Sequence, residues 1–376
     1  MTKSAPTLST KVIVGALALL APVLVVELAL RGAGYDPLGA TLGRTSLVRP
    51  SSRPDLGYEL VPNARGAGWG TAVEVNSLGL RGPEPRSTGE ARIACLGDSV
   101  TFGNNLAFED TWPRALEREL ARQGQKVETL NLALGGYDTV QELAALEEKG
   151  LALAPRHVVL AFCVNDLGVV SMSMETSFQP GDEENPLYLS RIAQWFHVKA
   201  VDKAQRRALY ERNREASYAR LFADEIDVLP GTPGFQDELA SLKSAVAGAP
   251  AADHDLATRR IPARWYASEA RLGRLEHAFA RLERLASERG FAVTLLLVPY
   301  LEDDALIERG YGLVRTLALA HGFAVVDPTS EFHRRGLAEL RVLAEDPVHP
   351  DAEGHALLAR ALAPVVGAAL TSAPTD

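Results

Sequence analysis

The sequence has few of the residues that build metal sites and disulfide frameworks. It contains two cysteines, Cys95 and Cys163. These cannot form a disulfide framework or a four-thiolate zinc site. The eight histidines are scattered, and the chain has neither an HExxH nor a CxxC motif. We therefore do not expect a zinc enzyme.

Positive charge is also scarce. Lys and Arg number 39 against 48 Asp and Glu, which gives a net charge of −9. Because phosphate neutralisation supplies most of the affinity for nucleic acid, an acidic chain without a basic cluster predicts no nucleic-acid partner. Apolar residues make up 47% of the 376 residues and charged residues 23%, which is an ordinary globular composition. The chain can bury a large core in one large domain with additions, or in two domains.

One apolar run stands at the N-terminus. Val12–Leu30 spans nineteen residues with Glu27 as its only charge, and a bilayer core needs about 20 apolar residues in a helix. Lys3 and Lys11 precede the run. A buried core helix is the alternative, but the terminal position and the flanking lysines favour a signal-anchor or a signal peptide over residues 1–30.

No A-x-A cleavage site follows this run, because Arg31 comes directly after it. We therefore favour an uncleaved anchor over a cleaved signal. The N-terminal lysines predict that the N-terminus stays in the cytoplasm. The rest of the chain would then lie outside the cytoplasm, in the cell envelope.

Residues 31–90 are rich in Gly, Pro, Arg and Ser. Apolar residues alternate over Thr71–Val75, as in a half-buried strand. The segment Asn76–Arg81 is typical of a turn, with Gly79 available for a positive φ. We expect a linker and a small β-rich lead-in.

Strand-like and helix-like patterns alternate from about residue 91 onward. Helical spacing occurs at residues 111–122, 140–151, 271–289, 307–321 and 352–370. The apolar runs that predict strands are residues 92–97, 127–132, 157–162, 291–298 and 323–327. This alternation predicts a three-layer α/β/α sandwich over residues 91–370, with a mainly parallel five-stranded sheet.

The stretch at about 167–265 is longer than a compact α/β unit needs. Leu187–Asn213 predicts an amphipathic helix that places Leu189, Ile192, Trp195 and Phe196 on one side. Residues 229–255, rich in Pro, Gly and Ala, look looser. Two interpretations stay open: a helical insertion packed on the domain, or a lid over a site at the carboxyl ends of the strands.

Two glycine-containing segments follow the first two predicted strands. Ser99 comes directly after Gly97-Asp98, at the head of the sheet, where a helix N-terminus favours developing negative charge. Gly136 lies in a paired-glycine turn, which brings backbone N–H groups close to a ligand. Either segment alone is typical of an ordinary turn.

Two further segments complete the set. Asn165 follows the third strand and can donate a hydrogen bond into the same cleft. His349 lies three residues after Asp346 on a loop with two prolines, which suits an imidazole oriented by a carboxylate. Asp327 competes for that role, and we prefer Asp346 because it shares the loop with His349. His355 is expected to pack or to cap a helix.

Acyl transfer needs a nucleophile, a base, an orienting acid and oxyanion donors. All are present, in an order that a parallel sheet can gather at one edge. The chain resembles the SGNH/GDSL hydrolase family over about residues 92–370, apart from the insertion. The blocks that carry the resemblance are Gly97-Asp98-Ser99, Gly136, Asn165 and Asp346-x-x-His349.

The resemblance implies a flavodoxin-like fold and carboxyl-ester chemistry, without a metal or an organic cofactor. Ser99 would be the nucleophile, His349 the base, and Asp346 the residue that orients the imidazole. The oxyanion would be held by the N–H groups of Ser99 and Gly136 and by the Asn165 side chain. The partner would be an ester-bearing small molecule or glycan.

The sequence departs from the family at Cys163, where the family usually has Gly. A side chain there would narrow the cleft, which affects substrate size. The apolar N-terminus and the element Asn76-x-x-Gly79-x-Arg81 resemble an envelope-associated branch linked to surface-polysaccharide modification. The leading hypothesis is thus an anchored esterase or deacetylase. An O-acyltransferase on an envelope polysaccharide, and a non-catalytic glycan- or partner-binding protein, remain alternatives.

Overall fold

The structure is a computed structural model. Its packing divides the chain into two compact units, Met1–Thr45 with Ser173–Tyr210, and Ser46–Met172 with Glu211–Asp376. The residues that the structure describes are 8–33, 47–53, 55–86, 90–168, 190–193, 229–247 and 263–372. Most of the predicted helix Leu187–Asn213, including Trp195 and Phe196, lies outside these ranges.

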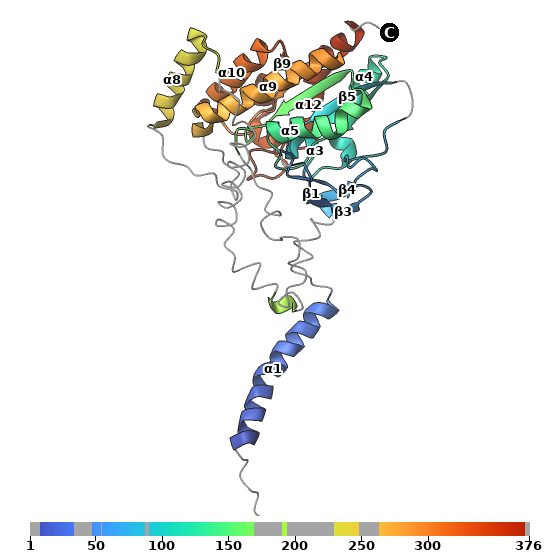
Figure 1. The fold of residues 1–376 in the computed structure, drawn as a ribbon, viewed down its shortest axis with the longest axis vertical. Coiled ribbons are helices and arrows are strands. Elements are labelled where there is room, and N and C mark those ends of the chain that lie inside the picture. The colour runs from blue at the N-terminus through green and yellow to red at the C-terminus, as the bar shows by residue number, and fades with distance from the viewer. Residues whose placement is uncertain are drawn as a thin grey trace, which may run out of the picture. The chain divides into compact units, whose positions relative to one another are not determined.

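The first unit contains helix α1 (Leu8–Gly32), drawn in blue in Figure 1. Most of its described apolar side chains are exposed, including all four at the consecutive positions 23–26: Leu20, Val23, Leu24, Val25, Val26 and Leu28. The Glu27 carboxylate accepts hydrogen bonds from the Arg191 N–H at 2.9 Å, the Ile192 N–H at 3.1 Å and the Ser190 hydroxyl at 3.1 Å. The single charge of the apolar run thus binds residues 190–192 of the predicted insertion.

The second unit is built on a parallel sheet of five strands in the order β6-β5-β7-β8-β9. All six residues of β7 are buried, as expected for a parallel strand with both sheet faces covered. The strands confirm the predicted runs within two residues at each end: β5 (Ala91–Leu96), β6 (Val127–Asn131), β7 (His157–Phe162), β8 (Ala292–Leu297) and β9 (Ala324–Val326).

Helices cover both faces of this sheet. Along the chain, β6 is added on one side of β5, and β7, β8 and β9 are then added in turn on the other side. Since such crossovers are right-handed, the first helix lies on one face and the next three on the other. The first is α4 (Trp112–Arg122), against which α12 (Ala352–Ser372) packs; the others are α5 (Thr139–Ala145), α9 (Glu269–Arg289) and α10 (Ala305–Ala320). This is the predicted three-layer α/β/α sandwich.

Among the helices whose side chains the structure describes throughout, α12 is the one long and apolar enough to cross a membrane, and 56% of its apolar window is buried. It contacts α4, β7, β8 and β9. Its apolar residues therefore belong to the protein core.

Two small antiparallel ribbons precede the sheet within the same unit. Strand β1 (Val48–Pro50) pairs with β2 (Tyr58–Leu60), and β3 (Arg65–Gly68) pairs with β4 (Thr71–Glu74). Strand β4 confirms the alternation seen in the sequence. The small β-rich lead-in is therefore present, and it packs in one unit with the sheet.

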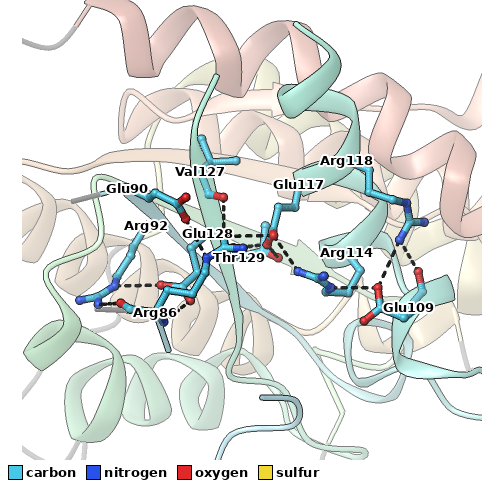
Figure 2. A network of polar contacts seen from close by, with 10 residues as sticks. All are labelled: Arg86, Glu90, Arg92, Glu109, Arg114, Glu117, Arg118, Val127, Glu128 and Thr129. Atoms are coloured by element: carbon cyan, nitrogen blue, oxygen red, sulfur yellow. Dashed lines mark hydrogen bonds and ion pairs between the residues drawn. The ribbon is translucent and has the colours of Figure 1, made fainter. Parts of the chain in front are cut away.

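The segment between the lead-in and β5 covers the outer edge of β6 (Figure 2). The Arg86 N–H donates to Glu128 at 2.6 Å, and the Arg86 guanidinium donates to the Val127 carbonyl at 2.8 Å. Glu117 of α4 accepts the Thr129 N–H at 2.9 Å. These contacts satisfy backbone groups that an open edge strand would leave unpaired.

Three elements differ from the sequence expectations. The helix predicted to run to residue 151 ends at Ala145 and continues as a π turn (Leu146–Gly150) and a 3₁₀ turn (Leu151–Leu153). The predicted loose region contains a regular helix, α8 (Pro233–Ala247). It buries Phe235, Leu239 and Leu242 and packs against α10. Packing of this apolar stripe outweighs the local Pro and Gly content.

The third difference lies at the start of α4, which begins at Trp112, one residue after the predicted start. The Thr111 side chain does not cap this helix, because its hydroxyl donates to the Phe108 carbonyl at 2.7 Å. His355 of α12 caps it instead: Nδ1 accepts the Trp112 N–H at 2.9 Å. The expectation that His355 caps a helix is confirmed. Burial, with the charges of His349 and Arg81, lowers the pKa of His355 to about 3, which keeps the ring neutral as an acceptor.

We predict that His355→Ala costs about 1 kcal/mol of unfolding free energy at pH 7.5, as for other lost N-caps. Unfolded His titrates near pH 6.5 and the folded ring near 3, so wild-type stability falls as the pH drops through that window. At pH 5 the wild type should have lost about 2 kcal/mol that His355→Ala does not lose, so the difference should reverse and the variant should be the more stable by about 1 kcal/mol. Urea unfolding at both pH values measures this; an unchanged difference would contradict it.

Candidate active site

Ser99 is the first residue of a one-turn helix, α3 (Ser99–Phe102), directly after β5. Asp98 caps this helix by accepting the Val100 N–H at 2.8 Å. Gly97 precedes it with φ of +152°, and a Cβ there would fall 2.0 Å from the Thr101 hydroxyl oxygen. Only glycine fits this sharp turn, which lifts Ser99 to the carboxyl edge of the sheet.

His349 joins Ser99 to Asp346. Its Nε2 lies 2.7 Å from the Ser99 hydroxyl oxygen, and its Nδ1 lies 2.9 Å from an Asp346 carboxylate oxygen. The other Asp346 oxygen accepts the N–H groups of Val348 at 3.0 Å and His349 at 3.3 Å, which fixes the loop. The side chains of Ser99, His349 and Asp346 are all buried. The structure thus brings together three predicted residues from two ends of the domain.

The Ser99 hydroxyl has a second neighbour. An oxygen of Asp98 lies 3.1 Å away, against 2.7 Å for the His349 nitrogen. A hydroxyl has one proton to donate, and the shorter contact favours donation to the imidazole. Asp327, the competing carboxylate, lies elsewhere: it accepts the Thr329 N–H at 3.0 Å and pairs with Arg315.

Gly136 and Asn165 follow the two strands beside β5. Gly136 has φ of +83°, and Asn165 is buried, with its Oδ1 lacking a hydrogen-bond partner. Among the described residues, the N–H groups of Ser99 and Gly136 donate no hydrogen bond. Because β5, β6 and β7 are parallel neighbours, their carboxyl ends bring these donors to one edge. They are available to an anionic oxygen.

Cys163 occupies the position where the resemblance leads one to expect glycine. It is buried, and burial together with the charges of Asp98 and Asp166 raises the pKa of its thiol well above the usual range. The reactive thiolate is therefore suppressed. Its N–H donates to Asp166 at 2.9 Å. Burial also raises the pKa of Cys95, so both cysteines act as small core side chains.

Sequence reasoning missed a buried group of carboxyl side chains beside the site. Glu142 of α5 is buried, and neither of its side-chain oxygens has a hydrogen-bond partner among the described residues. Burial raises its pKa well above the usual range, and the charges of Asp166, Asp98 and Asp138 raise it further. Burial and these charges therefore favour the neutral form of Glu142. Helical spacing alone could not have shown this, because the other carboxylates come from three different loops.

The lead-in was also missed as part of the site. The Tyr58 hydroxyl donates to the Gly135 carbonyl at 2.9 Å, and the Tyr137 hydroxyl donates to the Tyr58 carbonyl at 2.7 Å. Arg81 binds the loop that follows Ser99. Within the described part of the chain, no group of three or more His, Cys, Asp or Glu side chains could hold a metal ion.

Comparison with known families agrees with this arrangement. Residues 95–357, more than half of the chain, match the sequence profile of the GDSL-like lipase/acylhydrolase family. The chain belongs to this family. It is therefore a carboxylic ester hydrolase by class, and the non-catalytic alternative loses its support.

The solved structures with similarity to the chain include three hydrolases. LAE5, an α/β hydrolase from the metagenome of Lake Arreo, is 16% identical, with a TM-score of 0.39 over 77% of this chain and 99% of that one. Axe2, an acetylxylan esterase from Geobacillus stearothermophilus, is 15% identical, with a TM-score of 0.39 over 74% of this chain and 95% of that one. A lipase/acylhydrolase from Enterococcus faecalis is 14% identical, with a TM-score of 0.39 over 74% of this chain and 96% of that one. A search among curated proteins gave no match.

We predict that Glu142→Gln is more stable than the wild type at pH 8. Because the folded pKa of Glu142 is raised, its contribution to stability is present below the ordinary Glu value of about 4.5 and lost as pH rises. Glutamine keeps the shape without the charge. Its advantage in melting temperature should vanish towards pH 4.5. Glu288→Gln at an exposed position of α9 is the control, and an equal gain there would contradict the prediction.

Proposed function

We propose that this chain is a serine ester hydrolase with Ser99 as nucleophile, His349 as general base and Asp346 as the residue that orients the imidazole. The observation that carries the proposal is the continuous hydrogen-bonded series from the Ser99 hydroxyl through the His349 ring to Asp346, with contacts of 2.7 and 2.9 Å. A nucleophile, a base and an orienting acid within hydrogen-bond reach are the minimum for acyl transfer.

In the first step Ser99 Oγ attacks the acyl carbonyl carbon, and its proton passes to His349 Nε2. Asp346 accepts the Nδ1–H and stabilises the imidazolium. The tetrahedral intermediate collapses, the C–O bond to the alcohol breaks, and His349 returns the proton to the leaving oxygen. Water then attacks the acyl-serine by the same proton path. The carboxylic acid leaves and Ser99 is regenerated.

The carbonyl oxygen becomes negatively charged in both steps. We assign its stabilisation to the N–H groups of Ser99 and Gly136 and to the Asn165 side-chain amide. Support comes from the two amides, which donate no hydrogen bond among the described residues, and from the buried Asn165 side chain, for which none is found there. Losing one such donor typically lowers kcat by about 10²- to 10³-fold.

The substrate class we propose is an acyl ester carried by a cell-surface glycan. Helix α1 would anchor the enzyme in the membrane, with the hydrolase unit outside the cytoplasm. The support is that apolar side chains at the consecutive positions 23–26 are all exposed on α1, and a helix that is apolar on every side suits lipid. An enzyme held at the membrane surface meets envelope polymers at high effective concentration.

The first test of the mechanism is active-site labelling. A fluorophosphonate probe should label the wild type, because a serine that donates its hydrogen bond to an imidazole base is nucleophilic, and Ser99→Ala should not be labelled. Turnover of 4-nitrophenyl acetate should fall by at least about 10³-fold in that variant.

Thr371→Ala, which removes an exposed hydroxyl on α12, is the matched control. Labelling that survives in Ser99→Ala would overturn the assignment of the nucleophile. With an acetylated polysaccharide, release of free acetate supports hydrolysis. Transfer of the acetyl group to added oligosaccharide would instead make the enzyme an O-acyltransferase, with a sugar hydroxyl in place of water.

The anchor has its own test. The full chain should stay with the membrane fraction after alkaline carbonate extraction, since an apolar helix of about 20 residues spans the bilayer. A chain without residues 1–33 should move to the soluble fraction and keep its turnover of 4-nitrophenyl acetate. If the shortened chain still pelleted with membranes, a second membrane-binding surface would be required.

A further inference from the structure

Arg81 of the lead-in binds the peptide carbonyls at the end of the nucleophile helix. Its Nη1 donates hydrogen bonds to the carbonyls of Phe102 and, at 2.9 Å, of Gly103. Its Nη2 donates to the Leu106 carbonyl at 2.8 Å. The guanidinium also lies over the Phe102 ring, 4.7 Å from its centroid. One side chain thus holds three carbonyls that follow Ser99 closely in the chain.

Helix α3 needs such external contacts. It has four residues, whereas isolated helices shorter than about 12 residues are marginal in water. The last carbonyls of any helix lack partners within the helix. Asp98 satisfies the N-terminal end of α3, and Arg81 satisfies the C-terminal end, where a cation also interacts favourably with the helix dipole. The backbone that carries Ser99 is therefore fixed at both ends.

Stability alone does not explain this arginine. Arg81 is 2% exposed, and among the described residues it forms no ion pair. Burial lowers the pKa of Arg81 to about 10, so the group stays charged at neutral pH. Since a buried charge without a carboxylate partner destabilises a fold, its presence beside the nucleophile helix indicates a functional role.

The chain presents Arg81 through a rigid turn. The Asn76 side-chain oxygen accepts the N–H groups of Leu78 and Leu80, each at 3.0 Å. Gly79 completes the turn with φ of +74°, and a Cβ there would lie 3.1 Å from a backbone carbonyl oxygen. The position of Arg81 is therefore set by hydrogen bonds and a glycine within its own turn.

We propose that Arg81 is a positioning residue of the hydrolase: by holding the carbonyl end of α3, it keeps the Ser99 hydroxyl at hydrogen-bond distance from His349. The inference rests on the proposed role of Ser99. A misplacement of about 1 Å at a reacting group can cost about 10²-fold in rate. Because Arg81 acts through the nucleophile, its loss should lower kcat and leave KM nearly unchanged.

The experiment compares Arg81→Met and Arg81→Lys with the wild type, all as full chains in detergent. We expect Arg81→Met to lower kcat for 4-nitrophenyl acetate, and the rate of fluorophosphonate labelling, by about 10²-fold. KM should change by less than about threefold. Arg81→Lys should recover part of the loss, because lysine keeps the charge without the planar fork. Methylguanidinium added to Arg81→Ala should restore activity several-fold.

Arg92→Met is the matched control. Arg92 is partly buried, and like Arg81 it donates to a backbone carbonyl, that of Leu153 at 3.0 Å. It lies at the opposite end of β5 from Ser99. Its loss should lower the melting temperature and leave kcat within about twofold. Equal losses of kcat in Arg81→Met and Arg92→Met, in proportion to melting temperature, would show a merely structural role and overturn the inference.

Three further outcomes are decisive. If Arg81→Met does not fold, Arg81→Lys decides: a kcat at least about 10-fold lower at constant KM supports positioning, and a wild-type kcat overturns it. If the probe labels wild type and the folded Arg81 variants at one rate, the inference fails while the proposed function stands. If the wild type is not labelled at Ser99, the proposed function fails and the inference fails with it.

Discussion

The hydrogen bond between the Ser99 hydroxyl and His349, 2.7 Å long, depends on the whole sheet. The serine follows the second strand of the spatial order and the histidine precedes the last helix, 250 residues later in the chain. A short contact over such a separation requires a rigid frame between the two residues. The parallel strands supply it, since their carboxyl ends meet at one edge.

Much of the polar structure around this contact is unusually buried. The nucleophile loop lies between Arg81, a cation without a carboxylate partner among the described residues, and a group of acids that includes Glu142. Both kinds of group cost stability in a core. Arg81 holds the backbone carbonyls at the end of the nucleophile helix, and the raised pKa of Glu142 favours its neutral form beside the site.

The lead-in changes how the domain is understood. Its two ribbons look like accessory structure, yet Tyr58 supports the turn that carries Gly136, and Arg81 supports the helix that carries Ser99. Both residues act on backbone carbonyls and touch no predicted catalytic side chain. A hydrolase unit cut at about residue 90 would keep every family motif and lose both supports.

The sequence by itself determined the strands of the sheet, the acyl-hydrolase family and the five residues that we assign to the site, because each depends on local patterns: apolar runs, turn glycines and short spacings. Tertiary structure decided what depends on packing between distant segments. It capped α4 with His355 from another helix, and it formed a helix instead of a loose loop at residues 233–247. It also made Glu142 and Arg81 neighbours of the site. Burial and long-range hydrogen bonds set these outcomes, and no local window contains both partners.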